Sequence, residues 1–99
     1  MKLVYFPVHA RAAAIRMLLS HARVEYTDET ISFEEFGKRK EAGEYPNGQL
    51  PVLCHEGRVL NESIAILRFL GTIYGYYPQE DNLIAWDADA TIDFCMEYM

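Results

Sequence analysis

The sequence predicts an α/β domain with a mixed four-stranded sheet, in the chain order β-α-β-α-β-β-α, followed by one further helix. Three observations support this prediction. A β-prone run over 2–6 leads into a helical pattern, a second strand-like run covers 24–31, and an apolar run over 50–54 precedes a hairpin. We expect residues 1–75 to form the domain, 76–82 a linker, and 83–99 the further helix.

The first strand and the first helix meet at a turn that contains Pro7. The helical pattern consists of Ile15, Leu18, Leu19 and Ala22 on one side, with Arg16, Ser20 and Arg23 on the opposite, solvent-facing side. Arg11 is expected in the first helical turn, where a cation opposes the helix dipole at a cost of about 0.3–1 kcal/mol. Arg11 is therefore either a solvated side chain or, together with the helix N-terminus, part of an anion site.

A second strand and a second helix are predicted directly after the first helix. The strand over 24–31 should lie parallel to the first, because a helix connects the two. Ser32 and Glu35 have the spacing of a capping box, so a short helix should begin there. The basic run 38–40 suits the end of that helix and is interpreted as solvated, and Gly43 can terminate it.

The remainder of the sheet is predicted from a proline and a hairpin signal. Pro51 opens an apolar strand without disturbing the ladder bonds that follow, and Glu56-Gly57 is typical of a tight hairpin. Asn61 is expected to cap a third helix over 62–74. Glu62 and Ser63 would then lie at a helix N-terminus.

The last helix is predicted to run from Leu83 to the final residue without a stop signal. Asp89, Asp93 and Glu97 stand four residues apart, where like charges repel by about 0.2–0.5 kcal/mol per pair. The helix is also expected to expose apolar side chains, namely Ile84, Ile92, Phe94, Met96 and Met99. Both features indicate a helix that belongs to a larger assembly, covered either by a further domain or by another chain.

The composition of the chain argues against nucleic-acid-binding and membrane-spanning proteins. The chain has 99 residues, of which 51% are hydrophobic, and a net charge of −6, which argues against a nucleic-acid partner. No apolar run approaches the roughly 20 residues needed to span a membrane. Cys54 and Cys95 show neither a disulfide framework nor metal-ligand spacing, and the three histidines are scattered. These features favour a metal-free protein of the reducing cytoplasm.

Three motifs together resemble the glutathione-binding N-terminal domain of cytosolic glutathione transferases, with the nearest likeness to the pi and sigma classes. They are Tyr5-Phe6-Pro7-Val8-x-x-Arg11, Gly48-Gln49-Leu50-Pro51 and Glu62-Ser63-Ile64-Ala65-Ile66, and the likeness extends over about 2–75. The resemblance implies a thioredoxin-like fold, with 83–99 as the first helix of an all-helical second domain. It also implies a homodimer that uses glutathione as co-substrate and hydrophobic electrophiles as second substrates.

The resemblance assigns a role to individual residues. Tyr5 would donate a hydrogen bond to the sulfur of glutathione and favour the thiolate, which is the nucleophile. Ser63 would bind the γ-glutamyl carboxylate and Glu62 the α-amino group. The full set implied for glutathione is Phe6, Arg11, Lys40, Gln49, Leu50, Pro51, Glu62 and Ser63, with Glu97 reaching across the dimer.

The sequence departs from the family pattern in one corner of the site. Phe36 and Ala42 stand where the family has a tryptophan and a lysine for the glycine carboxylate of glutathione, and Lys38 or Lys40 could replace that lysine. Glu62 stands where pi and sigma members usually have glutamine. The resemblance further implies a cis bond between Leu50 and Pro51.

Two other functions stay open at this point. The first is a non-catalytic module that keeps the transferase fold to dock in a larger protein assembly, and the second is a glutathione-dependent isomerase. A thioredoxin-type redox enzyme is excluded, because residues 8–11 read Val-His-Ala-Arg where that chemistry needs Cys-x-x-Cys.

Overall fold

The structure is a computed structural model that describes residues 1–78 and 80–97. Gln79, within the predicted linker, and Tyr98 and Met99, within the predicted last helix, lie outside the described residues. The elements are β1 (Lys2–Tyr5), the 3-10 turn η1 (Ala10–Ala12), α1 (Ala13–His21), β2 (Thr27–Thr30), α2 (Phe33–Glu41), β3 (Val52–His55), β4 (Arg58–Leu60), α3 (Ser63–Ile73) and α4 (Asn82–Met96). The predicted order of strands and helices is confirmed.

The four strands form one mixed sheet in the order β2-β1-β3-β4. β2 lies parallel to β1, as predicted, with Tyr5 opposite Thr30. β3 runs antiparallel to both β1 and β4. The β3–β4 hairpin turns at Glu56 and Gly57, whose φ angles of 49° and 77° match the two positive φ values that a tight I′ turn requires.

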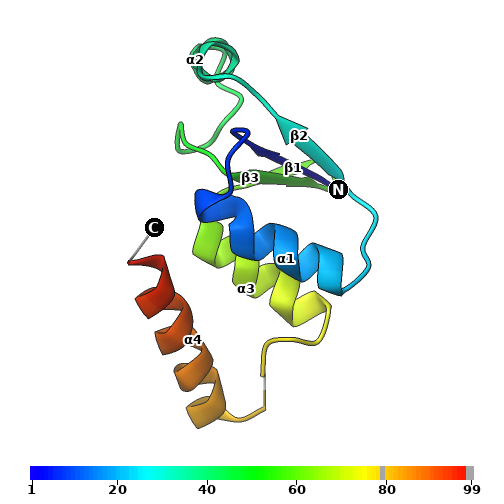
Figure 1. Ribbon diagram of the computed structural model, residues 1–99, viewed down its shortest axis with the longest axis vertical. Helices are drawn as coiled ribbons and strands as arrows, with labels where there is room; N and C mark the ends of the chain where they lie inside the picture. The colour runs from blue at the N-terminus through cyan, green and yellow to red at the C-terminus, as the bar shows by residue number, and fades with distance from the viewer. Residues whose placement is uncertain (79, 98–99) are drawn as a thin grey trace.

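The strands alternate between two cores. Leu3, Tyr5 and Leu53 pack against α1 and α3, which lie side by side on one face of the sheet (Figure 1). Val4 and Val52 point to the opposite face and pack with Ile31 and Tyr45 beneath α2. Because successive side chains of a strand point to opposite faces, the sheet becomes the middle of three layers.

Helix α2 begins and ends as the sequence indicates, but its basic end is not simply solvated. The Ser32 hydroxyl accepts a bond from the Glu35 amide at 3.1 Å, which is half of the expected capping box. The Glu35 carboxylate binds Arg39 instead, at 3.1 Å. Arg39 also pairs with Glu29 on β2 at 2.6 Å and so fastens α2 to the sheet. Gly43, with a φ of 77°, ends the helix in the left-handed region.

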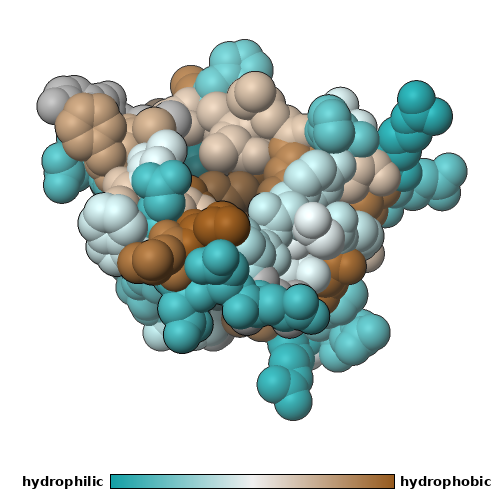
Figure 2. Space-filling model, turned by 90° about the horizontal axis from the view of Figure 1, so that it is seen from below, coloured by the Kyte–Doolittle hydropathy of each residue, from teal (hydrophilic) through white to brown (hydrophobic). Residues whose placement is uncertain are grey.

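Helix α4 starts at the end of the molecule farthest from the sheet and runs back toward the level of the sheet (Figure 1). It begins one residue earlier than predicted, where the Asp81 carboxylate accepts bonds from the amides of Leu83 and Ile84. The predicted exposure of Met96 is wrong, since this side chain is only 8% exposed. Other apolar side chains of α4 are exposed, among them Leu83, Ile84 and Trp86, and the end of the molecule viewed in Figure 2 shows brown areas among teal ones.

In the described part of the chain, no helix combines the length and the apolar character that crossing a membrane requires.

Candidate functional site

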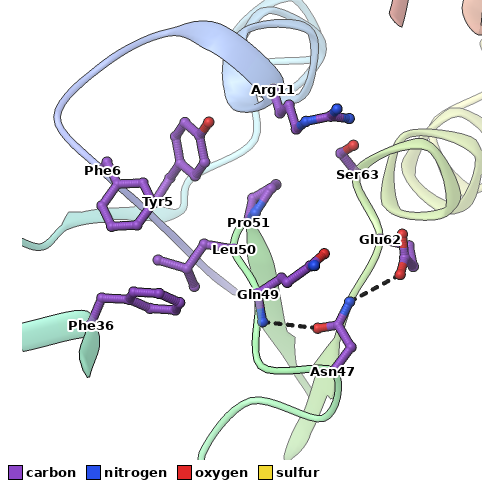
Figure 3. A pocket seen from close by; sticks show the side chains of 10 residues that line it. All are labelled: Tyr5, Phe6, Arg11, Phe36, Asn47, Gln49, Leu50, Pro51, Glu62 and Ser63. Carbon is purple, nitrogen blue, oxygen red and sulfur yellow. Dashed lines mark hydrogen bonds between the residues drawn. The ribbon is translucent and has the colours of Figure 1, made fainter. Parts of the chain in front are cut away.

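Four segments of the chain meet at one end of the sheet and enclose a cleft of about 610 Å³ (Figure 3). They are the end of β1 with the turn after it, one residue of α2, the loop before β3, and the start of α3. The side chains that line the cleft are Tyr5, Phe6, Arg11, Phe36, Asn47, Gln49, Leu50, Pro51, Glu62 and Ser63. The structure thus brings together eight of the ten residues that the sequence analysis named for the site.

Tyr5 is the last residue of β1 and lies at the floor of the cleft. Its side chain is 6% exposed and belongs to the core between the sheet and α1. Figure 3 shows its hydroxyl beyond the end of the strand, on the side where Arg11 lies. A phenol held in this way presents a hydrogen-bond donor to the cleft while its ring is fixed by packing.

Arg11 and Ser63 supply the features that an anion requires. The sequence predicted Arg11 in the first turn of the helix, but Arg11 lies in the 3-10 turn that precedes α1. Ala10 adopts a φ of 32°, and the regular helix starts only at Ala13. Ser63 is the first residue of α3 and is 8% exposed. The first amides of a helix lack partners within the helix, so the guanidinium, the hydroxyl and these amides can bind a carboxylate together.

The turn before α3 differs from the prediction. Glu62, not Asn61, is the residue that precedes the helix, with φ 68° and ψ 109°. This conformation reverses the chain between β4 and α3, and it leaves the Glu62 carboxylate at the cleft rather than over the helix end (Figure 3). A side chain with a Cβ seldom adopts such a positive φ, so the turn stores backbone strain at the site.

Asn47 is a cleft residue that the sequence analysis missed. Its Nδ2 donates to Glu62 Oε1 at 2.9 Å, and its Oδ1 accepts from the Gln49 amide at 3.2 Å. Asn47 therefore links the loop before β3 to the start of α3. The sequence carries a signal for this residue, because asparagine before glycine is typical of a turn, and such side chains commonly bond the backbone two residues on.

The bond between Leu50 and Pro51 is cis, as the resemblance implies. Pro51 is buried, and the partly buried Leu50 packs against both cores of the sheet. The backbone that enters β3 thus forms one wall of the cleft.

Two predicted residues lie outside the lining that the structure describes. The Lys40 ammonium stands 5.8 Å from the centre of the Phe36 ring, at the margin of the cleft. Glu97 follows α4 and is exposed. Lys40 could approach a ligand by extending its side chain, whereas Glu97 would reach a site only on another molecule.

An aromatic cluster closes the side of the cleft next to α2. Phe6 stacks on Phe33 with ring centres 4.4 Å apart, and it meets the edge of Phe36 at 5.3 Å. Phe36 in turn lies over Tyr45, and burial raises the pKa of the Tyr45 hydroxyl. The sequence analysis missed Phe33, whose side chain projects into solvent except where Phe6 covers it.

The described residues contain neither a cluster of metal ligands nor a disulfide. Within residues 1–78 and 80–97, no three His, Cys, Asp or Glu side chains gather as a metal site would need. Both cysteines are free thiols, Cys54 partly buried and Cys95 exposed.

Comparisons with known proteins identify the family and the fold. Residues 1–72 match the family described as glutathione S-transferase, N-terminal domain. A Caenorhabditis elegans protein named "Probable glutathione S-transferase 6" is 40% identical over 98 residues, and the match covers 99% of this chain and 46% of the relative. The chicken hematopoietic prostaglandin D synthase is 32% identical over 101 residues, with 99% and 48% covered. This chain therefore spans about half the length of the curated relatives it matches.

The solved structures agree with these relatives. A monomeric glutathione S-transferase of the hookworm Necator americanus superposes with a TM-score of 0.88 at 34% identity, over 98% of this chain and 46% of that one. The fold is thus that of a thioredoxin-like domain with a cleft at one end of its sheet. The chain belongs to the glutathione S-transferase family and contains its N-terminal domain.

Proposed function

We propose that this chain binds glutathione in the cleft and that the protein is a glutathione transferase. The observation that carries the proposal is the meeting of Tyr5 at the end of β1, Arg11 in the 3-10 turn and Ser63 at the start of α3 in one cleft. Arg11, Ser63 and the first amides of α3 would hold the γ-glutamyl carboxylate, and Glu62 would accept from the α-amino group. The sulfur would then lie near the Tyr5 hydroxyl.

The remaining lining residues have supporting roles in this proposal. The backbone at Leu50, before Pro51, would pair with the cysteinyl part of the peptide, with Phe6 and Gln49 adding contacts on either side. Lys40 would extend to the glycine carboxylate, where the family lysine is replaced by Ala42. Phe36 would supply an aromatic surface where the family has tryptophan.

The proposed chemistry is nucleophilic attack by the glutathione thiolate. The thiol loses its proton to solvent water, and Tyr5 donates a hydrogen bond that favours the resulting anion. The thiolate then forms a carbon–sulfur bond with a hydrophobic electrophile while the leaving group departs. Tyr5 stabilises the negative charge of the sulfur through a hydrogen bond and forms no covalent bond to either substrate.

We further propose that residues 1–75 form the glutathione-binding domain, 76–82 a linker and 83–99 the first helix of an all-helical second domain. The exposed side chains of Leu83, Ile84 and Trp86 support this proposal, because a second domain would cover them.

The chain would act in the cytoplasm as a homodimer in which Glu97 approaches the partner's glutathione. The hookworm relative is described as monomeric, so dimerisation needs a direct measurement.

A second candidate activity is a glutathione-dependent isomerisation. The similarity to the chicken prostaglandin D synthase favours it, since the same thiolate would serve both reactions. Product analysis separates the two activities, because conjugation keeps the glutathione sulfur in the product whereas isomerisation releases glutathione unchanged.

Calorimetric titration of glutathione into the chain tests the proposal. We expect Ser63→Ala to weaken binding about tenfold, since a hydrogen bond to a charged group contributes about 1.5–3 kcal/mol. Tyr5→Phe should bind nearly normally but lose the ultraviolet absorption of the bound thiolate. If neither the chain nor a chimera continued with the second half of the C. elegans relative binds glutathione, the transferase proposal fails and the docking module is favoured.

A further inference from the structure

Arg16 on α1 contacts the segment that carries the cleft residues Tyr5 and Phe6. Its Nη1 donates to the Val8 carbonyl at 2.6 Å, and its Nη2 lies 3.5 Å from the Phe6 carbonyl. The guanidinium carbon stands 5.8 Å from the centre of the Tyr5 ring. The prediction that Arg16 faces solvent is therefore wrong, since only 15% of its side chain is exposed.

The segment needs these donors because it forms no regular ladder or helix. The Val8 amide turns back to the Phe6 carbonyl at 2.7 Å, and Pro7 between them has no N–H to contribute. The planar fork of an arginine can bind two carbonyl oxygens at once, which a lysine ammonium does less well. Arg16 therefore fastens the turn immediately after Tyr5 to the body of α1.

A second anchor fixes the guanidinium from the sheet. Its Nε lies 3.1 Å from Asp28 Oδ2, and its Nη2 lies 3.4 Å from Asp28 Oδ1. Asp28 belongs to β2 and stands opposite Leu3 on β1, two residues before Tyr5. The carboxylate of Asp28 largely compensates the positive charge of Arg16. Arg16 therefore affects Tyr5 mainly by fixing the position of the Tyr5 ring and not by the electric field of its charge.

We propose that Arg16 is a positioning residue for Tyr5, which holds the ring and the following turn so that the hydroxyl points at the ligand sulfur. The inference rests on the proposed function of Tyr5. Arg16 lies outside the lining described for the cleft, so it acts through Tyr5 and the turn and not by touching glutathione. A donor displaced by a fraction of an ångström stabilises an anion less, because hydrogen bonds weaken steeply with distance and angle.

The test separates the sulfur from the rest of the ligand. Arg16→Met removes both anchors, and the ultraviolet titration of bound glutathione should then shift to higher pH by about one unit. Binding of S-methylglutathione, which has no thiol to ionise, should change by about threefold or less. Arg23→Met is the matched control, because Arg23 is exposed just after the same helix and the charge change is identical.

A second background shows whether the effect passes through Tyr5. In Tyr5→Phe, the thiolate absorption is lost at neutral pH because the titration moves to higher pH, and the further change Arg16→Met should leave the titration at that higher pH. Asp28→Asn, which frees the guanidinium without deleting it, should shift the titration in the same direction by a smaller amount. Arg16→Lys should restore little of the titration, because one ammonium cannot bind the carbonyls and Asp28 together.

Three results would overturn the inference: an unchanged titration in Arg16→Met, an equal shift in the Tyr5→Phe background, or a parallel loss of S-methylglutathione binding. The last result would mean that Arg16 merely supports the fold. Failure of the proposed function is distinguishable, since the unaltered chain would then bind no glutathione before any substitution is made.

Discussion

Arg68 on α3 donates to Asp89 on α4 across 2.7 Å, and a second guanidinium nitrogen donates to Asp93 at 3.3 Å. The Tyr77 hydroxyl, from the segment between the two helices, donates to the same Asp89 carboxylate at 2.9 Å. Two of the three acidic residues predicted to repel one another along α4 are thus bridged by a cation from α3. This link holds α4 at the side of the glutathione-binding domain (Figure 1).

Replacing Arg68 with methionine should loosen α4 while the sheet stays intact. The pair is about one third exposed on each side, so we expect a loss of at most about 1 kcal/mol of unfolding free energy. Amide hydrogen exchange should become faster along α4 and remain unchanged in β1 and β3. Arg58→Met, with the same charge change on exposed β4, is the control. Equal exchange in the two variants would contradict the proposed link.

The pairing of Glu29 with Arg39 should make stability fall in acid. The hydrogen bond from Arg39 holds the pKa of Glu29 below its ordinary value of 4.5. A lowered pKa means that the folded state favours the carboxylate, so this contribution is present above pH 4.5 and is lost as the pH falls through the folded-state value. Glu29→Gln should therefore lose more stability at pH 7 than at acid pH, as urea unfolding at both pH values will show.

The control for this pH effect is Glu34→Gln. Glu34 pairs with Lys38 at 3.7 Å, and both side chains are largely exposed, so the pair contributes little. If Glu34→Gln and Glu29→Gln reduced the acid dependence equally, the effect would come from net charge and not from the Glu29–Arg39 bond.

The positive φ at Glu62 predicts different outcomes for two substitutions that both remove its carboxylate. Glycine accepts a φ of 68° without strain, whereas alanine does not. Because glycine also gains freedom in the unfolded chain, we expect Glu62→Gly to be the more stable variant by only about 0.5–1 kcal/mol. Both should weaken glutathione binding to the same extent in calorimetry. A more stable alanine variant would show that the turn is not strained.

The core between the sheet and the helices should be intolerant of cavities. Ile66 on α3 is 1% exposed and packs within that core. Ile66→Ala should lower the free energy of unfolding by about 2–5 kcal/mol, because it removes buried methylene groups and leaves a cavity. Met17→Ala, on α1 and 71% exposed, is the control and should change stability by less than about 0.5 kcal/mol.

Much of the site could be predicted because its residues lie in short motifs with local geometry. Tyr5 ends β1 and Ser63 begins α3, whereas Leu50 and Pro51 come directly before β3, which starts at Val52 rather than within the first residues of the predicted run. The sequence analysis failed where a contact depends on the approach of distant segments. Asn47 reaches Glu62 across 15 positions, and nothing in the local pattern around Asn47 indicates that partner.

The charged side chains show the same limit most clearly. Periodicity places Arg16, Arg39 and Asp89 on polar faces, which is correct for each helix by itself. Tertiary packing then brings Asp28, Glu29 and Arg68 opposite them at 2.6 to 3.1 Å. Their partners come from other elements, so a pattern within one element cannot reveal them.

The sequence by itself determined the order of elements, because strand-like runs, helical spacing and turn chemistry act over a few residues. The family resemblance of its three motifs named eight of the ten residues that line the cleft. Only the tertiary structure decided that Arg16 turns toward Tyr5, that Glu62 and not Asn61 precedes α3, and that Arg68 joins α4 to the domain. Those features depend on distances between segments, and such distances are set when the layers pack together.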